Sequence, residues 1–132
     1  MAAFAFELVS PDKLIFSGPA ESVLVPGADG DFLVLVDHAP VMSSIRPGVV
    51  DIADSQGKHT RVFVRGGFAD VSPVGVIVLA ETALPVEELS GAKLDQEIKT
   101  AEEDVADASE DAKRLVQERL DRLRELKDAM KL

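Results

Sequence analysis

The chain has 132 residues and a net charge of −10, is 46% hydrophobic, and contains no cysteine, tryptophan or tyrosine. This length suits one small domain, or one domain with an appendage. The absence of cysteine excludes disulfides, zinc–cysteine sites and thiol nucleophiles. The negative charge disfavours nucleic acid and anionic lipid as partners.

We expect a soluble, cytoplasmic protein. No apolar run is long enough to cross a bilayer. The N-terminus lacks the features of a signal or transit peptide.

Up to position 84, apolar and polar residues alternate with the period of β-strands. Turn signals divide this region into eight to ten short strands. The expected segments are 4–10, 13–17, 21–26, 31–37, 49–53, 60–65, 68–71 and 74–80. Segment 31–37 (DFLVLVD) is apolar on both faces, which predicts a strand buried from two sides. No helix-length segment lies between the strands, so we exclude parallel βαβ crossovers and expect an antiparallel β-sandwich or flattened barrel.

Three glycine-containing segments have predicted roles within the β region. Residues 54–58 (DSQGK) separate two alternating segments, which predicts a β-hairpin. Gly66 and Gly67 interrupt the alternation, as a bulge or a tight corner would. Residues 27–30 (GADG) are glycine-rich but include no lysine and open no helix, so we interpret them as a turn rather than a phosphate loop.

After Pro85 the period changes to that of helices, which predicts a domain over 1–84 and an antiparallel two-helix hairpin over 85–132. Ser90 is placed to cap the first helix, and Asp107 or Ser109 the second. The first predicted apolar stripe comprises Leu94, Ile98, Ala101, Val105 and Ala108. The second comprises Val116, Leu120, Leu123 and Met130, with Leu126 beside it. Lys127 occupies a core position and should weaken the seam.

The two predicted helices differ in charge. Residues 87–111 carry ten acids and two bases, whereas residues 112–132 carry four acids and seven bases. The opposite charges favour pairing, although exposed ion pairs stabilise only weakly. Two solvated helices that close a small fold, and a hairpin that opens for a partner, are both compatible with this pattern.

No arrangement of residues indicates catalysis. Asp37 and His38 are adjacent, and neighbouring strand residues point to opposite faces, so Asp37 is poorly placed to orient His38. Ser43 and Ser44 lie in no nucleophile motif, and two separated histidines are poor material for a metal site. We therefore predict no catalytic residue, no metal and no cofactor.

Several segments, in this order and spacing, resemble the epsilon subunit of F-type ATP synthases. They are Phe16-Ser17-Gly18, Glu21, 27–31, His38-Ala39-Pro40, 46–50 (RPGVV), 65–71 (RGGFADV) and 78–83 (VLAETA). The resemblance covers essentially the whole chain. It implies a β-sandwich followed by a helical hairpin, in agreement with the change of period.

The resemblance also implies a function. Members of the family are non-catalytic rotor subunits that bind the gamma subunit and the ring of c subunits, and couple proton-driven rotation to ATP synthesis by the alpha and beta subunits. The chain would be peripheral, at the cytoplasmic face of a bacterial membrane. The positions that match the c-ring contact are Asp31 and His38-Ala39-Pro40, where His38-Ala39-Pro40 could also simply shape a turn.

The family's hairpin can extend into the catalytic head and inhibit ATP hydrolysis, which implies contacts through basic residues of the second helix. The matching candidates are Arg114, Arg119, Arg122 and Arg124.

The chain departs from the family pattern at two places. Val36-Asp37 stands where many relatives have Pro-Gly, so the turn before His38 could differ. Some members bind ATP through Ile/Leu-Asp-x-x-Arg-Ala. Here Leu89 matches the first position, whereas Ser90, Lys93 and Leu94 replace the Asp, the Arg and the Ala. The carboxylate and the bidentate arginine are missing, so we expect no useful ATP binding. The alternative to a rotor subunit is a free β-sandwich adaptor whose hairpin docks on a partner protein.

Overall fold

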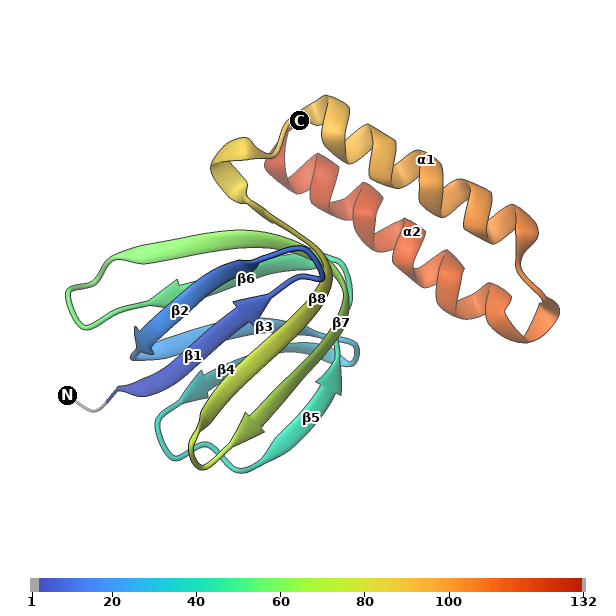
Figure 1. Ribbon diagram of the computed structural model, residues 1–132. Helices are drawn as coiled ribbons and strands as arrows, with labels where there is room; N and C mark the ends of the chain where they lie inside the picture. Colours follow the sequence, from blue (N-terminus) through green and yellow to red (C-terminus); the bar gives the residue numbers. More distant parts are fainter. Residues whose placement is uncertain (1–2, 132) are drawn as a thin grey trace. The chain divides into compact units, whose positions relative to one another are not determined.

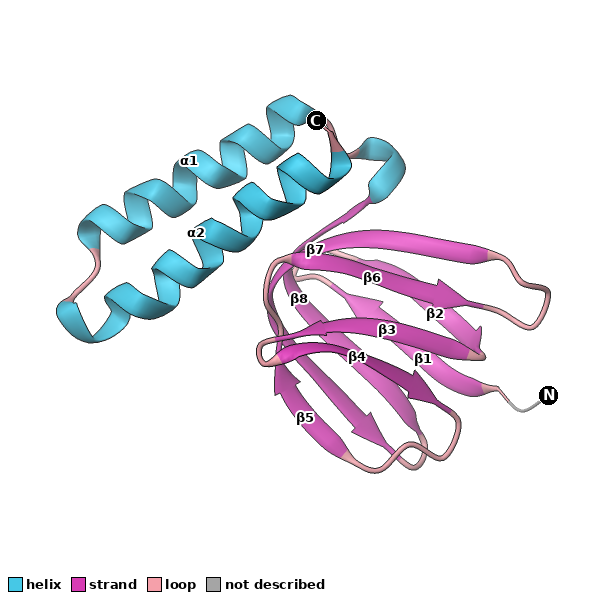
Figure 2. Ribbon diagram, turned by 180° about the vertical axis from the view of Figure 1, so that it is seen from behind, coloured by secondary structure: helices cyan, strands magenta, loops and turns pink. Residues whose placement is uncertain are grey.

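The computed structural model describes residues 3–131, and the chain divides between residues 86 and 87 into two compact units. The first unit is a sandwich of β-strands and the second is a pair of helices (Figures 1 and 2). The predicted fold class is therefore confirmed.

Most strands of the first unit follow the predicted segments, but the predicted segments 60–65 and 68–71 form a single strand, β7 (His59–Ser72). The strands are β1 (Phe4–Val9), β2 (Leu14–Ala20), β3 (Ser22–Gly27), β4 (Gly30–Leu35), β5 (Val41–Ser44), β6 (Gly48–Ala53), β7 (His59–Ser72) and β8 (Gly75–Pro85). The hydrogen-bonded order is β2-β1-β8-β7-β6-β3-β4, and β5 pairs with β7. Strand β5 was not predicted, because four residues that include Ser43 and Ser44 carry almost no alternation.

One strand pair differs from the predicted antiparallel arrangement. Strands β1 and β8 pair in parallel, with Ala5 opposite Gly75 and Val9 opposite Leu79. A parallel pair needs a long connection, for which a helix is the usual solution. Here the other strands of the sandwich form that connection, so the fold needs no helix between β1 and β8.

The prediction that segment 31–37 is buried on both faces is wrong. Strand β4 ends the hydrogen-bonded order and buries only one face. Val34 points into the core, whereas Leu33 and Leu35 are each 51% exposed. The continuous apolar sequence of β4 therefore corresponds to one face in the core and a second apolar face that is exposed.

Strand β7 pairs with β8 without a register shift through Gly66 and Gly67. Of the two predicted alternatives, this excludes a bulge, and a tight corner remains. Its first half pairs with β6 and its second half with β5, while β8 follows both halves. Gly66 (φ 75°) and Gly67 (φ 106°) both adopt backbone conformations that favour glycine. A Cβ on Gly67 would lie 1.9 Å from the carbonyl oxygen of Leu79, so the two strands meet more closely there than any side chain allows.

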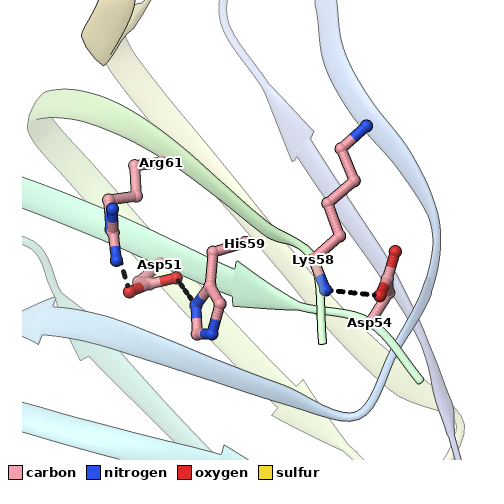
Figure 3. Close-up of polar contacts among 5 residues, drawn as sticks. All are labelled: Asp51, Asp54, Lys58, His59 and Arg61. Carbon is pink, nitrogen blue, oxygen red and sulfur yellow. Dashed lines mark hydrogen bonds and ion pairs between the residues drawn. The ribbon is translucent and has the colours of Figure 1, made fainter. Parts of the chain in front are cut away.

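The predicted hairpin at residues 54–58 is present between β6 and β7. The Asp54 carboxylate accepts hydrogen bonds from the backbone N–H groups of Gln56 (2.9 Å) and Lys58 (3.0 Å), the latter drawn in Figure 3. An aspartate that bonds back to the following backbone stabilises such a turn.

The core of the sandwich consists of the inward-facing residues of the alternating strands. Phe6, Leu8, Val23, Val25, Val50, Val64 and Val78 are completely buried. Each large apolar side chain buried in this way stabilises a fold by about 1.5–3 kcal/mol. The sandwich thus has a closed core of its own.

The second unit consists of α1 (Gly91–Asp107) and α2 (Glu110–Met130), preceded by a 3₁₀ turn, η1 (Val86–Glu88). The Ser90 hydroxyl caps α1 by accepting a hydrogen bond from Lys93 N–H (3.1 Å), and Ser109 caps α2 in the same way through Ala112 N–H (3.3 Å). The prediction for Ser90 is confirmed, and of the two candidates for the second cap Ser109 is the one used.

Most of the predicted stripe residues of the helices are buried or half-buried. Buried members are Leu94, Ala101, Leu120, Leu123 and Leu126. Ion pairs join the helices, among them Arg124–Glu102 (3.2 Å) and Lys127–Asp95. Lys127 is therefore accommodated near the seam by a carboxylate on the opposite helix.

Candidate interaction surfaces

The four predicted c-ring positions lie at one corner of the sandwich. Asp31 is the second residue of β4, and His38-Ala39-Pro40 forms the connection from β4 to β5. A shallow hollow of about 400 Å³ has both Asp31 and His38 in its wall, together with Asp29, Gly30, Phe32, Val41 and Ser43. The structure therefore brings the two candidate side chains to a common concave surface.

The connection before His38 is a tight turn. His38 N–H donates to the carbonyl oxygen of Leu35 (3.2 Å). Asp37 adopts a left-handed conformation with φ 64°, which aspartate tolerates better than most residues. The Asp at the position where relatives have Gly thus adopts a glycine-like backbone conformation.

His38 is half-buried and its ring is fixed on two sides. Its Nδ1 lies 2.6 Å from the carbonyl oxygen of Ala39, so Nδ1 carries the proton and donates. The Phe32 ring centroid lies 6.4 Å from the imidazole centroid. These contacts present Ala39 and Pro40 as an exposed turn.

Asp31 has a charged neighbour that sequence reasoning did not assign. Arg46, in the connection from β5 to β6, donates from Nη2 to Asp31 Oδ1 at 3.0 Å. The side chains of Arg46 and Asp31 are 33% and 44% exposed. The corner therefore presents an ion pair rather than an isolated carboxylate.

A second surface was not predicted as a site. We call the exposed side chains of Met42, Phe68, Ile77 and Leu79 the apolar face. Phe68 and Leu79 are directly opposite each other on β7 and β8, and Met42 and Ile77 flank Asp70 on the strands on either side of β7. These four side chains are 40–66% exposed. The sequence did contain a signal for the apolar face, because the segment 74–80 (VGVIVLA) is apolar on both faces of the strand.

The four positions that align with the ATP motif have structural roles. Ser90 caps α1, and Leu94 is completely buried. Leu89 is 8% exposed, and Lys93 extends along α1 towards Glu97 (3.9 Å). No carboxylate or guanidinium stands where the motif places them.

The four arginines of α2 are not equivalent. Arg114 pairs with Glu118 (3.4 Å), Arg122 with Glu125 (3.4 Å) and Arg124 with Glu102 (3.2 Å). Arg119 is exposed and has no ion pair within residues 3–131. Among these candidates, Arg119 alone would meet an acidic partner without giving up an existing ion pair.

Within residues 3–131, no three or more His, Asp or Glu side chains are grouped so as to hold a metal ion. Across the same residues, neither helix is long and apolar enough to cross a membrane.

Comparison with known proteins decides the family. A family model described as the β-sandwich domain of the ATP synthase delta/epsilon chain matches residues 3–86. The chain belongs to the ATP synthase delta/epsilon family. The ATP synthase epsilon chain of Parvibaculum lavamentivorans is 48% identical over 123 residues, which cover 92% of this chain and 93% of the relative. The epsilon chain of Mesorhizobium japonicum is 48% identical over 112 residues, covering 85% and 83% of the two chains.

Solved structures show the same fold. A chain of the Euglena gracilis mitochondrial ATP synthase, from a structure of OSCP, F1 and c-ring, aligns with a TM-score of 0.75 and 23% identity, over 98% of this chain and 82% of the other. A chain from the central stalk and c-ring of the Tetrahymena thermophila enzyme aligns with a TM-score of 0.56 and 10% identity, over 89% and 96%. The family model and the two epsilon chains confirm the resemblance noted from sequence motifs.

Proposed function

We propose that the chain is the non-catalytic epsilon subunit in the rotor of an F-type ATP synthase, where it couples rotation of the c ring to ATP synthesis through gamma. The observation that carries this proposal is the apolar face on a sandwich whose core is already closed. Grouped apolar side chains on a small domain mark a surface that another protein covers. The epsilon chains that match over more than four-fifths of their length support the same assignment.

The two surfaces of the sandwich suit two different partners. The apolar face suits gamma, because a stable interface has a core of fully buried apolar side chains. The corner with Asp31 and His38-Ala39-Pro40 suits the polar loops of the c ring, because it is charged and exposed. Attachment to the membrane is then peripheral and occurs through these partners, at the cytoplasmic face of a bacterial membrane. Proton transport belongs to the complete complex.

The helical hairpin serves as a conditional brake on ATP hydrolysis in this proposal. Arg119 supplies the first contact with acidic residues of the catalytic alpha and beta subunits, and Arg114, Arg122 and Arg124 follow by exchanging their present carboxylate partners. Such exchange is inexpensive for Arg114 and Arg124, because exposed ion pairs contribute only about 0–1 kcal/mol each, and it costs more for the half-buried Arg122.

ATP is not a ligand of this hairpin. Ser90 and Leu94 already serve as a cap and as a core residue, and Lys93 lacks the planar fork that binds phosphate bidentately. We expect calorimetric titration of the isolated chain with ATP to show no binding in the micromolar range. Heat release that saturates at micromolar ATP would contradict this expectation.

Binding to gamma tests the role of the apolar face. The double variant Phe68→Ser/Leu79→Ser removes two outward-facing side chains and leaves the core intact, so we expect assembly with gamma to weaken about tenfold or more. Val74→Ser is the matched control, since Val74 is 87% exposed in the turn between β7 and β8. Unchanged binding of the double variant would show that gamma docks elsewhere.

ATP hydrolysis by the reconstituted complex tests the hairpin. The full chain is compared with a version that ends at Val86, where the two compact units divide. We expect faster hydrolysis with the shorter version while assembly is retained. Equal rates in fully assembled complexes would mean that the hairpin is no brake under those conditions.

Cell fractionation distinguishes the rotor subunit from the alternative, a free adaptor whose hairpin docks on a partner protein. A rotor subunit sediments with membranes together with the other ATP synthase subunits. An adaptor stays in the cytosolic fraction.

A further inference from the structure

Arg46 reaches Asp31 because three chain segments are fixed to one another by their backbones. Arg46 N–H donates to the carbonyl oxygen of Pro26 (3.0 Å), and Pro26 is the cross-strand partner of Asp31 in the β3–β4 ladder. Ala28 N–H donates to the carbonyl oxygen of Ser44 (2.8 Å) in the same region. The position of Arg46 is therefore set by the fold before its side chain makes any ion pair.

The ion pair itself does little for the stability of the isolated sandwich. Both side chains are partly exposed, and pairs of this kind stabilise folds weakly. In addition, Arg46 Nε is shielded from water and finds no acceptor among the described residues, which is unfavourable. The pair is thus better explained by what it does to Asp31 than by what it adds to folding.

The pair fixes one oxygen of Asp31 and leaves the other available. Arg46 Nη2 contacts Oδ1 alone, and Asp31 has no second hydrogen bond or ion pair within residues 3–131. A carboxylate held through one oxygen has lost rotational freedom, so a second donor that approaches Oδ2 meets an oriented acceptor.

We propose that Arg46 is a positioning residue that orients Asp31 for the contact with the c-ring loop. This inference rests on the function proposed above. Because Arg46 compensates the charge of Asp31, the contact depends on the direction of a hydrogen bond more than on net charge. The partner group is therefore an N–H donor, an amide or a guanidinium, in a polar loop.

Because Arg46 compensates the charge of Asp31, the salt dependence of rotor binding tests the proposal. Net-neutral contacts depend weakly on ionic strength, whereas a bare carboxylate against a polar, partly basic loop depends on it strongly. Replacing Arg46 with an uncharged residue should therefore make rotor binding more sensitive to salt, and weaker at high salt, where only the lost orientation of Asp31 remains.

The experiment measures dissociation of the full-length chain from a rotor of gamma and c ring, at low and at high salt. We expect Arg46→Met to dissociate about tenfold faster at high salt, where Asp31 is no longer oriented and its charge is screened. Its salt dependence should be steeper, because at low salt the bare carboxylate attracts the partly basic loop. Arg46→Lys keeps the charge but not the planar fork, so we expect the wild-type salt dependence and an intermediate rate. Asp31→Asn should accelerate dissociation as much as Arg46→Met does. The double variant should dissociate no faster than Asp31→Asn alone.

The matched control is Arg61→Met. Arg61 Nε contacts Asp51 Oδ2 at 3.2 Å across β6 and β7, and His59 Nδ1 contacts the same carboxylate at 2.7 Å (Figure 3). Arg61→Met removes an exposed pair of the same kind away from the corner, and its dissociation rate should equal that of the wild type.

Two results would overturn the inference while leaving the proposed function in place. One is wild-type binding by Arg46→Met, and the other is an additive loss in the double variant, which would show that Arg46 acts independently of Asp31. Should Arg46→Met fail to fold, the comparison of Arg46→Lys with the wild type decides the question. Failure of the wild-type chain to bind the rotor would refute the proposed function, and with it this inference.

Discussion

Replacement of Gly67 by alanine tests how β7 turns the corner between β6 and β5. Gly67 has φ 106°, and a Cβ there would lie 1.9 Å from the carbonyl oxygen of Leu79 and 2.9 Å from Cα of Ala80. The first contact is more than an ångström too short, the second is also shorter than van der Waals contact, and both atoms belong to the backbone of β8. The strands must therefore separate at this point.

The expected cost has two parts. A residue with a side chain in this backbone conformation is strained by about 1–3 kcal/mol. Separation of β7 from β8 would break about two ladder hydrogen bonds, each worth about 0.5–1.5 kcal/mol. We therefore expect Gly67→Ala to lower the free energy of unfolding by about 2–6 kcal/mol in a denaturant titration.

Gly57→Ala separates the two parts. Gly57 also has a positive φ, 80°, but no atom lies within 4 Å of the position that its Cβ would take. This control should lose only the conformational part, about 1–3 kcal/mol. Equal losses in the two variants would refute the reasoning, because the close approach of β7 and β8 would then contribute nothing.

Two further predictions concern the helical hairpin. Leu123→Ala removes a completely buried side chain and should cost about 2–5 kcal/mol in the unfolding of the helices, followed by circular dichroism; Leu115→Ala, at a 52% exposed position of the same helix, should change stability by less than about 0.5 kcal/mol. Ser90→Ala removes the cap of α1 and should cost about 1 kcal/mol, seen as faster amide hydrogen exchange in the first turn of α1. Unchanged exchange there would mean that the hydroxyl does not stabilise the helix end.

Local sequence patterns predicted the parts of the fold that depend on neighbours in the chain. Alternation located most strands, the Asp54 turn defined a hairpin, and Ser90 marked the start of α1. The pairing of β1 with β8 depends on segments about 70 residues apart, and alternation carries no information about such partners.

The same distinction applies to the exposed face of β4. Leu33 and Leu35 look like core residues in sequence, because the residues of β4 alone do not show which of its two apolar faces turns towards the core. In a sandwich every strand turns one face to the core and one face away from it, as Phe68 on β7 and Leu79 on β8 also show. Apolar composition therefore failed to distinguish a buried face from an exposed one.

The candidate site shows how far motif reasoning reaches. Asp31 and His38 were named from their match to the epsilon family, and the structure places both at one hollow. Arg46 lies 15 residues from Asp31, and backbone contacts between the segments, such as that of Arg46 with Pro26, bring the two together. The sequence offered Arg46 as part of a motif but gave no indication of its partner.

The parallel pairing of β1 with β8 also has a consequence for the order of synthesis on the ribosome. Phe6 and Leu8 belong to the core, yet β8, the neighbour of β1 in the sheet, is made some 70 residues later. At roughly 5–20 residues per second, β1 waits for roughly 4–14 s. The nascent chain therefore passes through a period in which β1 can pair with β2 on one side but lacks its neighbour on the other, and the sandwich closes only as its last strand leaves the exit tunnel.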